Sequence, residues 1–300
     1  MTAEQVSRRI AIASMVISAS LASAKVIIGF QAHSTAVISD GFESAGDVLS
    51  SGLVLLGLVL AARPPDAEHP YGHGRVETLS GLGVGLMLVI SGSLISTRAL
   101  ERVGEAQRVP ASYALWPVAA SILIKFGMSL TKRRYARKIR SAALKADAWN
   151  DSVDVLSGTT ALVGLGVTLL NPQRFSAADQ IGGAAVGLIV IFLGVRVVRD
   201  TTLQLMDTMP DTKSMDQIRK VALSVSGAKG IEKCFARKTG LKWHVDLHLE
   251  VDPDMSVYQS HEIATQVRIR VIETLDWVAD VLVHVEPYQE AVPSRTHGKS

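Results

Sequence analysis

The chain has 300 residues, of which 48% are hydrophobic and 20% are charged, and its formal net charge is +3. This composition is too apolar for one ordinary soluble domain and indicates a membrane protein with a soluble part. The single cysteine, Cys234, excludes both a disulfide framework and a CxxC metal site.

Six apolar segments can each supply the ~20 residues that a transmembrane helix needs. They cover residues 10–30, 36–61, 79–100, 112–131, 142–170 and 178–199. The first segment carries Lys25 and has no small-residue cleavage site, so we interpret it as a retained helix and not as a signal peptide. Six spans put both termini on the same side of the membrane.

Basic residues determine the expected orientation. Arg8 and Arg9, then Arg63 and Arg75, then the basic run KRRYARKIR at 132–140 all fall on one side of the membrane. Under the positive-inside rule this side is the cytoplasm, and both termini lie there. The basic run could instead bind nucleic acid, but its place between two apolar segments favours membrane topology, with contact to anionic lipid as a further role.

The composition changes after residue 207, and residues 208–288 have the charge content of a water-soluble domain. The periodicity predicts a helix at 213–225, strands at 231–238 and 241–251, a helix at 257–275 and a strand at 280–286. This order gives a small open sheet with helices on one face. We therefore expect a membrane domain at 1–207, a soluble domain at 208–288 and a disordered tail at 289–300.

Carboxylates interrupt two of the apolar segments. Asp40, Glu43 and Asp47 are three and four residues apart, which puts them on one helical face. A carboxylate near the bilayer centre costs at least ~2.5 kcal/mol, so this face must look into a bundle or a wet cavity. The second such face carries Asp147, Asn150, Asp151 and Asp154. Two acidic faces that meet inside a membrane predict a cation site.

The central pair of motifs is Glu43-x-x-x-Asp47 and Asn150-x-x-x-Asp154. Residues four apart on a helix share a face, so two helices can supply four ligands around one ion. The alternative is a set of polar groups that only hold the helices together by hydrogen bonds. All the donors are oxygens, which favour cations such as Mn²⁺ and Fe²⁺, whereas imidazole and thiolate suit Zn²⁺.

A second group of candidate ligands lies between the second and third apolar segments. Asp66, His69 and His73 could converge on a metal in tetrahedral fashion. Pro70 and Gly72 argue against a continuous helix here, which excludes the helical HExxH motif of a metalloprotease. The alternative is a loop whose histidines only cap helix ends.

A third group lies in the soluble domain. It consists of His248, His261, His284 and Glu286, with Glu232 as a further candidate. His248 lies on the polar face of one predicted strand and the His284/Glu286 pair on that of another, so the three meet if the strands are adjacent. Surface histidines are common, and the alternative is that these bind nothing.

Together these features resemble the cation diffusion facilitator family. The resemblance covers nearly the whole chain, through the six spans, the two paired motifs, the loop HPYGHGRVE and a C-terminal domain that opens LMDTMPD. It implies an α-helical membrane protein with six transmembrane helices and a C-terminal cytoplasmic α+β domain of the metallochaperone-like αββαβ fold. It also implies the inner (cytoplasmic) membrane of a bacterium.

The resemblance further implies a homodimeric exporter of divalent metal driven by proton antiport, and not an enzyme. The metal would be substrate and regulatory ligand, with no cofactor and no nucleic acid. The implied transport site consists of Glu43, Asp47, Asn150 and Asp154. The implied further metal ligands are Asp66, His69 and His73 in the loop and His248, His261, His284 and Glu286 in the cytoplasmic dimer. Arg75 and Asp207 match a charge pair that locks the membrane helices at the family's dimer interface.

The chain departs from the zinc-transporting members at three of these positions. They carry His or Asp in place of Glu43, characteristically His in place of Asn150, and often His in place of Glu232. The absence of imidazole from the transport site disfavours zinc and favours manganese, then iron. A carboxylate must then carry the exchanged proton, and we expect Glu43 to do so. Asp40 would be a cavity or helix-end residue, and Asp147 or Asp151 could supply the missing charge or ligand.

Two other functions could use acidic residues inside a membrane. An intramembrane metalloenzyme would need a nucleophile or general base beside the metal, and usually histidine ligands, which the second and fifth segments lack. A transport-inactive sensor or partner of the same fold stays open, because Asn150 is a mild loss of ligand strength.

Overall fold

The computed structural model describes residues 3–31, 35–101, 115–170 and 178–289. The chain divides into two compact units, one ending at Met206 and the other beginning at Asp207. Except for its first residue, the expected tail lies outside the described residues. The side chains of Asp40 and Glu43 in the second helix are also outside the description.

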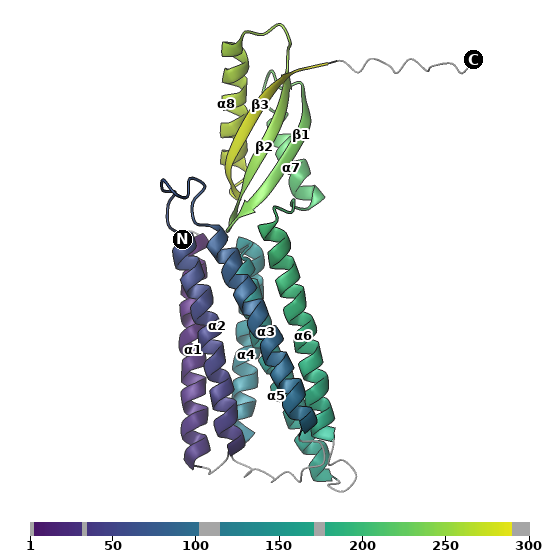
Figure 1. The fold of residues 1–300 in the computed structure, drawn as a ribbon. Coiled ribbons are helices and arrows are strands. Elements are labelled where there is room, and N and C mark those ends of the chain that lie inside the picture. The colour runs from purple at the N-terminus through teal and green to yellow at the C-terminus, as the bar shows by residue number, and fades with distance from the viewer. Residues whose placement is uncertain (1–2, 32–34, 102–114, 171–177, 290–300) are drawn as a thin grey trace, which may run out of the picture. The chain divides into compact units, whose positions relative to one another are not determined.

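The first unit is built from six long helices, which run side by side in Figure 1. They are α1 (Ala3–Gln31), α2 (Thr35–Ala61), α3 (Arg75–Glu101), α4 (Leu115–Ile139), α5 (Ala142–Leu170) and α6 (Ala178–Leu205). With 25 to 29 residues, each helix can span the hydrocarbon core of a bilayer. The six predicted helices are confirmed. Among the described residues, two helical segments, Gln5–Ile28 and Arg75–Glu101, are long and apolar enough to cross a membrane by length and hydropathy alone.

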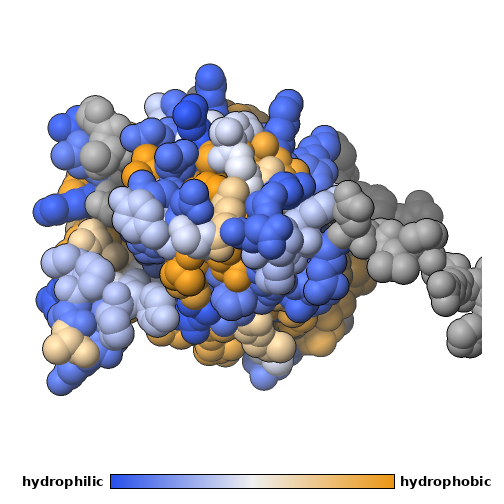
Figure 2. Space-filling model, turned by 90° about the horizontal axis from the view of Figure 1, so that it is seen from above, coloured by the Kyte–Doolittle hydropathy of each residue, from blue (hydrophilic) through white to orange (hydrophobic). Residues whose placement is uncertain are grey.

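Large apolar side chains point outward from this unit, which suits helices surrounded by lipid. The exposed ones include Val16, Ile27, Leu56, Leu86, Phe126, Leu188 and Phe192. Smaller apolar residues such as Val54, Val84 and Val190 form the core between the helices. Figure 2 views the molecule from another side, where hydrophilic residues predominate and hydrophobic ones are interspersed.

Glycines allow α3 and α6 to approach closely. A Cβ added at Gly92 would lie 2.8 Å from the backbone oxygen of Gly187, and one added at Gly194 would lie 2.8 Å from the backbone nitrogen of Val89. Small residues of this kind let membrane helices pack backbone against backbone. This pair of helices therefore forms a closely packed part of the unit.

The basic run does not form the loop that we expected. Instead, α4 continues through Lys132 to Ile139, and the chain turns at Arg140, whose φ is 57°, before α5 begins at Ala142. Our boundary at residue 131 was therefore wrong. Lys, Arg and Ala are good helix formers, so the run can continue the helix beyond the apolar segment.

Glu77 of α3 fixes the turn between α4 and α5. Its side chain is fully buried, and its Oε1 accepts a hydrogen bond from the hydroxyl of Ser141 at 2.6 Å and from the backbone N–H of Ala143 at 2.8 Å. Ser141 in turn accepts a bond from the N–H of Leu144. At the start of α5 the N–H of Ala143 is thus satisfied by the Glu77 carboxylate and the N–H of Leu144 by the Ser141 hydroxyl, and the negative charge of the carboxylate suits the positive end of the helix dipole.

The second unit is a three-stranded sheet with two helices. Its elements are α7 (Thr212–Ala222), β1 (Gly230–Thr239), β2 (Lys242–Val251), α8 (Val257–Thr274) and β3 (Val278–Pro287). The strand order is β1-β2-β3, with β1 antiparallel and β3 parallel to β2. The predicted αββαβ order is confirmed.

One face of this sheet forms the core of the second unit. Val245 and Leu247 of β2 pack with Ile218 of α7 and with Val267 and Val271 of α8. The alternate residues of β2, among them the histidines, lie on the opposite face. The fold thus leaves one polar face of the sheet available for ligands.

We predict that Glu77→Ala lowers the thermal unfolding temperature of the detergent-solubilised protein. Removal of the carboxylate leaves the Ser141 hydroxyl and the Ala143 N–H unsatisfied, and a hydrogen bond to a charged group contributes about 1.5–3 kcal/mol. Glu77→Gln keeps an acceptor and should lower it less. Equal unfolding temperatures for Glu77→Ala and the unmutated protein would contradict this role.

Candidate metal sites

The membrane helices bring together three of the four residues expected at the transport site. The amide nitrogen of Asn150 on α5 donates to Asp47 Oδ1 on α2 at 2.8 Å. Asp154, one turn further along α5, lies around the same point, because a single ammonium group contacts both Asp47 and Asp154. The fourth residue, Glu43, has a side chain outside the described residues.

The ammonium group between these carboxylates belongs to Lys125 of α4. Its Nζ lies 3.0 Å from Asp47 Oδ2, 3.0 Å from Asp154 Oδ2 and 3.2 Å from Asp151 Oδ1. It also donates to Ser18 Oγ of α1 at 3.3 Å. Lys125 was not among the residues that we singled out from the sequence.

A second buried lysine, Lys132, lies seven residues after Lys125 on α4. Lys132 Nζ is 2.7 Å from Asp147 Oδ2 and 2.6 Å from Asp151 Oδ2. Asp147 also accepts a hydrogen bond from Ser51 at 3.1 Å. Lys132 therefore pairs with α5 in the protein interior and does not lie in a loop between the two apolar segments.

The two lysines change the interpretation of Asp147 and Asp151. We considered these residues as substitutes for a missing histidine, and the structure pairs both with lysine. Four described carboxylates share two ammonium groups, so the cluster contains more acidic than basic side chains. A signal was present in the sequence, since Lys125 and Lys132 are seven residues apart and hence on one helical face. An ionisable residue in a span implies a buried partner.

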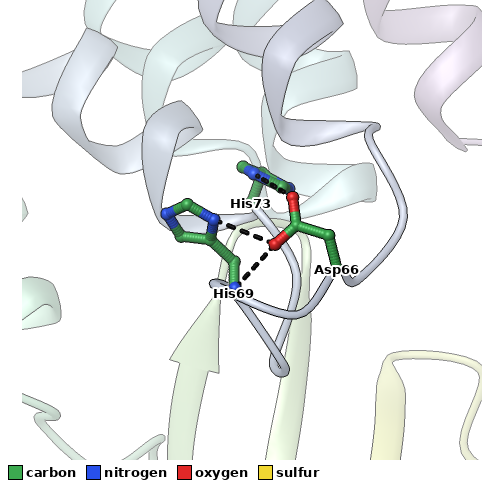
Figure 3. A group of neighbouring side chains, drawn as sticks. All are labelled: Asp66, His69 and His73. Carbon is green, nitrogen blue, oxygen red and sulfur yellow. Dashed lines mark hydrogen bonds and ion pairs between the residues drawn. The ribbon is translucent and has the colours of Figure 1, made fainter.

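Asp66, His69 and His73 converge between α2 and α3, as predicted (Figure 3). Asp66 Oδ1 lies 3.1 Å from His69 Nδ1, and Asp66 Oδ2 lies 3.4 Å from His73 Nε2. The two imidazole rings are 4.4 Å apart between centroids. A positive φ of 77° at Gly72 helps to form the turn that brings both rings to one carboxylate.

The backbone holds the Asp66 carboxylate ready to bind a cation. The N–H of His69 donates to Asp66 Oδ1 at 2.7 Å, and the N–H of Glu68 donates to the same oxygen at 3.1 Å. The hydrogen bond from the His69 backbone keeps the pKa of Asp66 below its usual value. Asp66 is therefore ionised at neutral pH and, with two imidazoles, offers the mixed oxygen and nitrogen ligands of a zinc-type site.

The sheet brings together His248, His284 and Glu286 on its polar face. His248 and His284 are direct partners in the β2–β3 register, and their ring centroids are 5.0 Å apart. Glu286 Oε1 lies 2.6 Å from His248 Nδ1 and 3.6 Å from His284 Nε2. The prediction that these three meet on adjacent strands is borne out by their positions; metal binding there stays a prediction.

Two further candidates of this group are placed differently. Glu232 lies at an irregularity of β1, where the register shifts between Ile231 and Cys234, and its Oε2 is 3.8 Å from His248 Nδ1. His261 lies exposed on α8, the helix that packs on the opposite, apolar face of the sheet. Within one chain it is not part of the His248 group, so a role for it would require a second chain.

Arg75 and Asp207 lie at the ends of membrane helices. Arg75 is the first residue of α3, and Asp207 follows α6 with a φ of 59°. They belong to different compact units, and their pairing at a dimer interface stays a prediction.

We predict that Lys132→Met strongly destabilises the detergent-solubilised protein. The change leaves Asp147 and Asp151 buried without their shared counter-ion, and breaking a buried pair on one side costs about 3–5 kcal/mol. Addition of Asp147→Asn should restore part of the loss. As a control, Lys145→Met removes an exposed ion pair with Asp200 and should change the unfolding temperature little. An equal effect of both lysine variants would refute the buried pairing.

Comparison with known proteins identifies the family. The profile of the cation efflux transmembrane domain matches residues 11–206, and that of the cation efflux protein cytoplasmic domain matches residues 210–288. Manganese efflux system protein MneP of Bacillus subtilis is 29% identical over 291 residues, which is 96% of this chain and 98% of MneP.

Metal tolerance protein C1 of Arabidopsis thaliana is 32% identical over 283 residues, or 89% of this chain, which spans 59% of that longer protein. A solved C-terminal domain of MamM is 26% identical with a TM-score of 0.25, covering 26% of this chain and 100% of that domain. The two profiles together match most of the chain, from residue 11 within α1 to residue 288 just after β3. The chain therefore belongs to the cation efflux family, the cation diffusion facilitators, and is a membrane transporter of divalent metal cations and not an enzyme.

Proposed function

We propose that the chain exports Mn²⁺, with Fe²⁺ next and Zn²⁺ third in preference, from the cytoplasm in exchange for protons. Transport would take place at Glu43, Asp47, Asn150 and Asp154. The observation that supports this site is that side chains from α2 and α5 surround one point, and that a cationic group already lies there. Carboxylates that hold an ammonium group at this point can also hold a metal cation in its place.

The ligand atoms support the order of metals. The metal-binding atoms of Asp47, Asn150 and Asp154 are all oxygens. Oxygen ligands suit Mn²⁺, whereas Zn²⁺ favours imidazole and thiolate ligands. MneP, a relative that aligns over nearly its whole length, bears the name of a manganese efflux system protein. The histidines among the described candidate ligands lie in the loop and in the soluble domain, and none lies in the membrane helices.

The remaining parts take the following roles in this proposal. The chain acts as a homodimer in the inner membrane of a bacterium, with both termini in the cytoplasm. Residues 1–207 carry the metal by alternating access, and Glu43 carries the exchanged proton. Residues 208–288 form the metal-sensing and dimerising domain, in which metal at the His248 group and His261 biases the transporter. Asp66, His69 and His73 form an additional site in the loop, and Arg75 and Asp207 pair at the dimer interface.

A second candidate is a transport-inactive partner of the same fold. It is favoured by one observation, namely that Lys125 lies where the metal would bind. In such a protein the lysine would replace the metal permanently, as a structural counter-ion. Metal-dependent release of protons from sealed vesicles that contain the protein separates this candidate from a transporter.

We predict that Asp47→Asn and Asp154→Asn each reduce Mn²⁺ flux into proteoliposomes by about two orders of magnitude or more, since each removes a charged ligand. Asp200→Asn, which changes a carboxylate on α6 that pairs with the exposed Lys145, is the matched control and should keep normal flux. Normal flux in either of the first two variants would mean that the transport site lies elsewhere.

We predict that Asn150→His shifts the flux preference towards Zn²⁺ by about tenfold relative to Mn²⁺, because it introduces the imidazole that zinc prefers. Asn150→Asp keeps an oxygen ligand and should leave the preference for Mn²⁺. The measurement is flux across a panel of divalent metals in proteoliposomes. An unchanged preference in Asn150→His would show that selectivity is determined elsewhere in the chain.

A further inference from the structure

We propose that the Lys125 ammonium is a tethered counter-cation that occupies the transport site when no metal is bound and leaves it when metal enters. The proposal rests on the proposed function, because it takes Asp47 and Asp154 as metal ligands. It assigns a role to a residue that the metal-binding motifs do not include.

The position of Lys125 is that of a bound cation. Its side chain is 1% exposed, and its Nζ reaches carboxylates from both ligand helices, α2 and α5. Burial of an ammonium group in a membrane domain is costly unless it is paired, and three carboxylates around one Nζ provide that pairing. The lysine therefore neutralises part of the charge that would otherwise face an empty site.

Metal and ammonium cannot share this position. Nζ lies 3.0 Å from both Asp47 Oδ2 and Asp154 Oδ2. A metal bonded to the same two oxygens at about 2.0–2.2 Å would lie on the place of Nζ or directly beside it. Two cations at such a distance in a poorly solvated interior repel each other strongly. Metal binding thus requires that Lys125 move away.

The contacts of Lys125 indicate where it moves. Besides Asp47 and Asp154 it contacts Asp151 Oδ1 at 3.2 Å and Ser18 Oγ at 3.3 Å, and neither belongs to the four proposed transport-site residues. A small rotation of the side chain can release the first pair and keep the second. The ammonium then stays paired with Asp151 while the metal occupies the site.

Asp154 is the more accessible of the two carboxylates. Its Oδ2 and the Oδ2 of Asp47 lie at the same distance of 3.0 Å from Nζ. The side chain of Asp154 is 31% exposed in the isolated chain, compared with 10% for Asp47. An arriving metal would therefore meet Asp154 first and Asp47 after the lysine has moved.

Removal of the Lys125 charge should therefore change two measurable properties, the affinity for metal and the rate at which the empty transporter returns. Loss of the lysine charge removes the competitor, so metal binds more tightly. It also leaves bare carboxylates in the empty site, so the conformational return without metal becomes slow. Exchange of metal for metal across the membrane does not involve the empty site and should continue.

The test compares Lys125→Met with the unmutated full-length protein, with Lys125→Arg as the variant that keeps the charge and Lys145→Met as the exposed control. Mn²⁺ binding is measured by calorimetry in detergent at one fixed pH. We expect Lys125→Met to bind Mn²⁺ at least about tenfold more tightly, because a like charge has been removed. Lys125→Arg should show no gain, and Lys145→Met should match the unmutated protein.

The second measurement is transport by the same variants in proteoliposomes. For Lys125→Met we expect net Mn²⁺ flux to fall about tenfold or more while Mn²⁺/Mn²⁺ exchange persists, since only the empty return needs the lysine. Lys125→Gln, which keeps a polar side chain of similar length, is measured in parallel, so that the comparison does not depend on one variant folding well.

The outcomes separate this inference from the proposed function. Unchanged or weaker Mn²⁺ binding in folded Lys125→Met and Lys125→Gln would overturn the inference, as would an equal loss of net flux and exchange. If Asp47→Asn and Asp154→Asn abolish Mn²⁺ binding in that case, the proposed transport site is retained although the inference about Lys125 is overturned. If these two variants bind Mn²⁺ normally, the proposed site is wrong and the inference falls with it.

Discussion

The membrane domain depends on one constraint, which is that carboxylates inside a membrane must be paired. The described parts of α2 and α5 place four carboxylates near one another. Two almost fully buried lysines of α4 form ion pairs with them. Asp151 links the two halves of this cluster, since one of its oxygens contacts Lys125 and the other Lys132. The positions of three helices are therefore tied together by charge.

Other features of the fold keep these helices in place. The fully buried carboxylate of Glu77 caps the start of α5 and so connects α3 to the helix that carries Asn150 and Asp154. Glycines bring α3 against α6, which leaves α1, α2, α4 and α5 to surround the charged cluster. Stability and ligand geometry thus depend on the same contacts.

The three candidate sites differ in their ligand chemistry. The membrane site offers only oxygens, whereas the loop and the sheet each combine two imidazoles with a carboxylate. The same metal need not prefer all three, because imidazole favours zinc-like ions and carboxylate or amide oxygen favours manganese. A chain that moves one metal through the membrane could therefore respond to another at its soluble sites.

Much of the fold and part of the site could be predicted from local patterns. Apolar segments located the six helices, and strict alternation in residues 241–251 placed His248 on the polar face where it meets His284. Glu232 lies 3.8 Å from His248 at a register irregularity of β1, and no periodicity in the sequence reveals this irregularity. Lys125 and Lys132 were missed because their partners lie on another helix, and Lys132 was assigned to a loop because the apolar run ends before it. Pairing of charges between helices requires the three-dimensional arrangement.

The central claim is that a metal ion takes the place of the Lys125 ammonium between Asp47 and Asp154. The most direct measurement is an experimental structure of the full-length protein with Mn²⁺, in which the metal is located by its anomalous scattering. We expect the manganese signal between these two carboxylates, with Lys125 Nζ withdrawn to Asp151 and Ser18. Manganese bound elsewhere in the membrane domain, with Lys125 still bridging Asp47 and Asp154, would contradict the account.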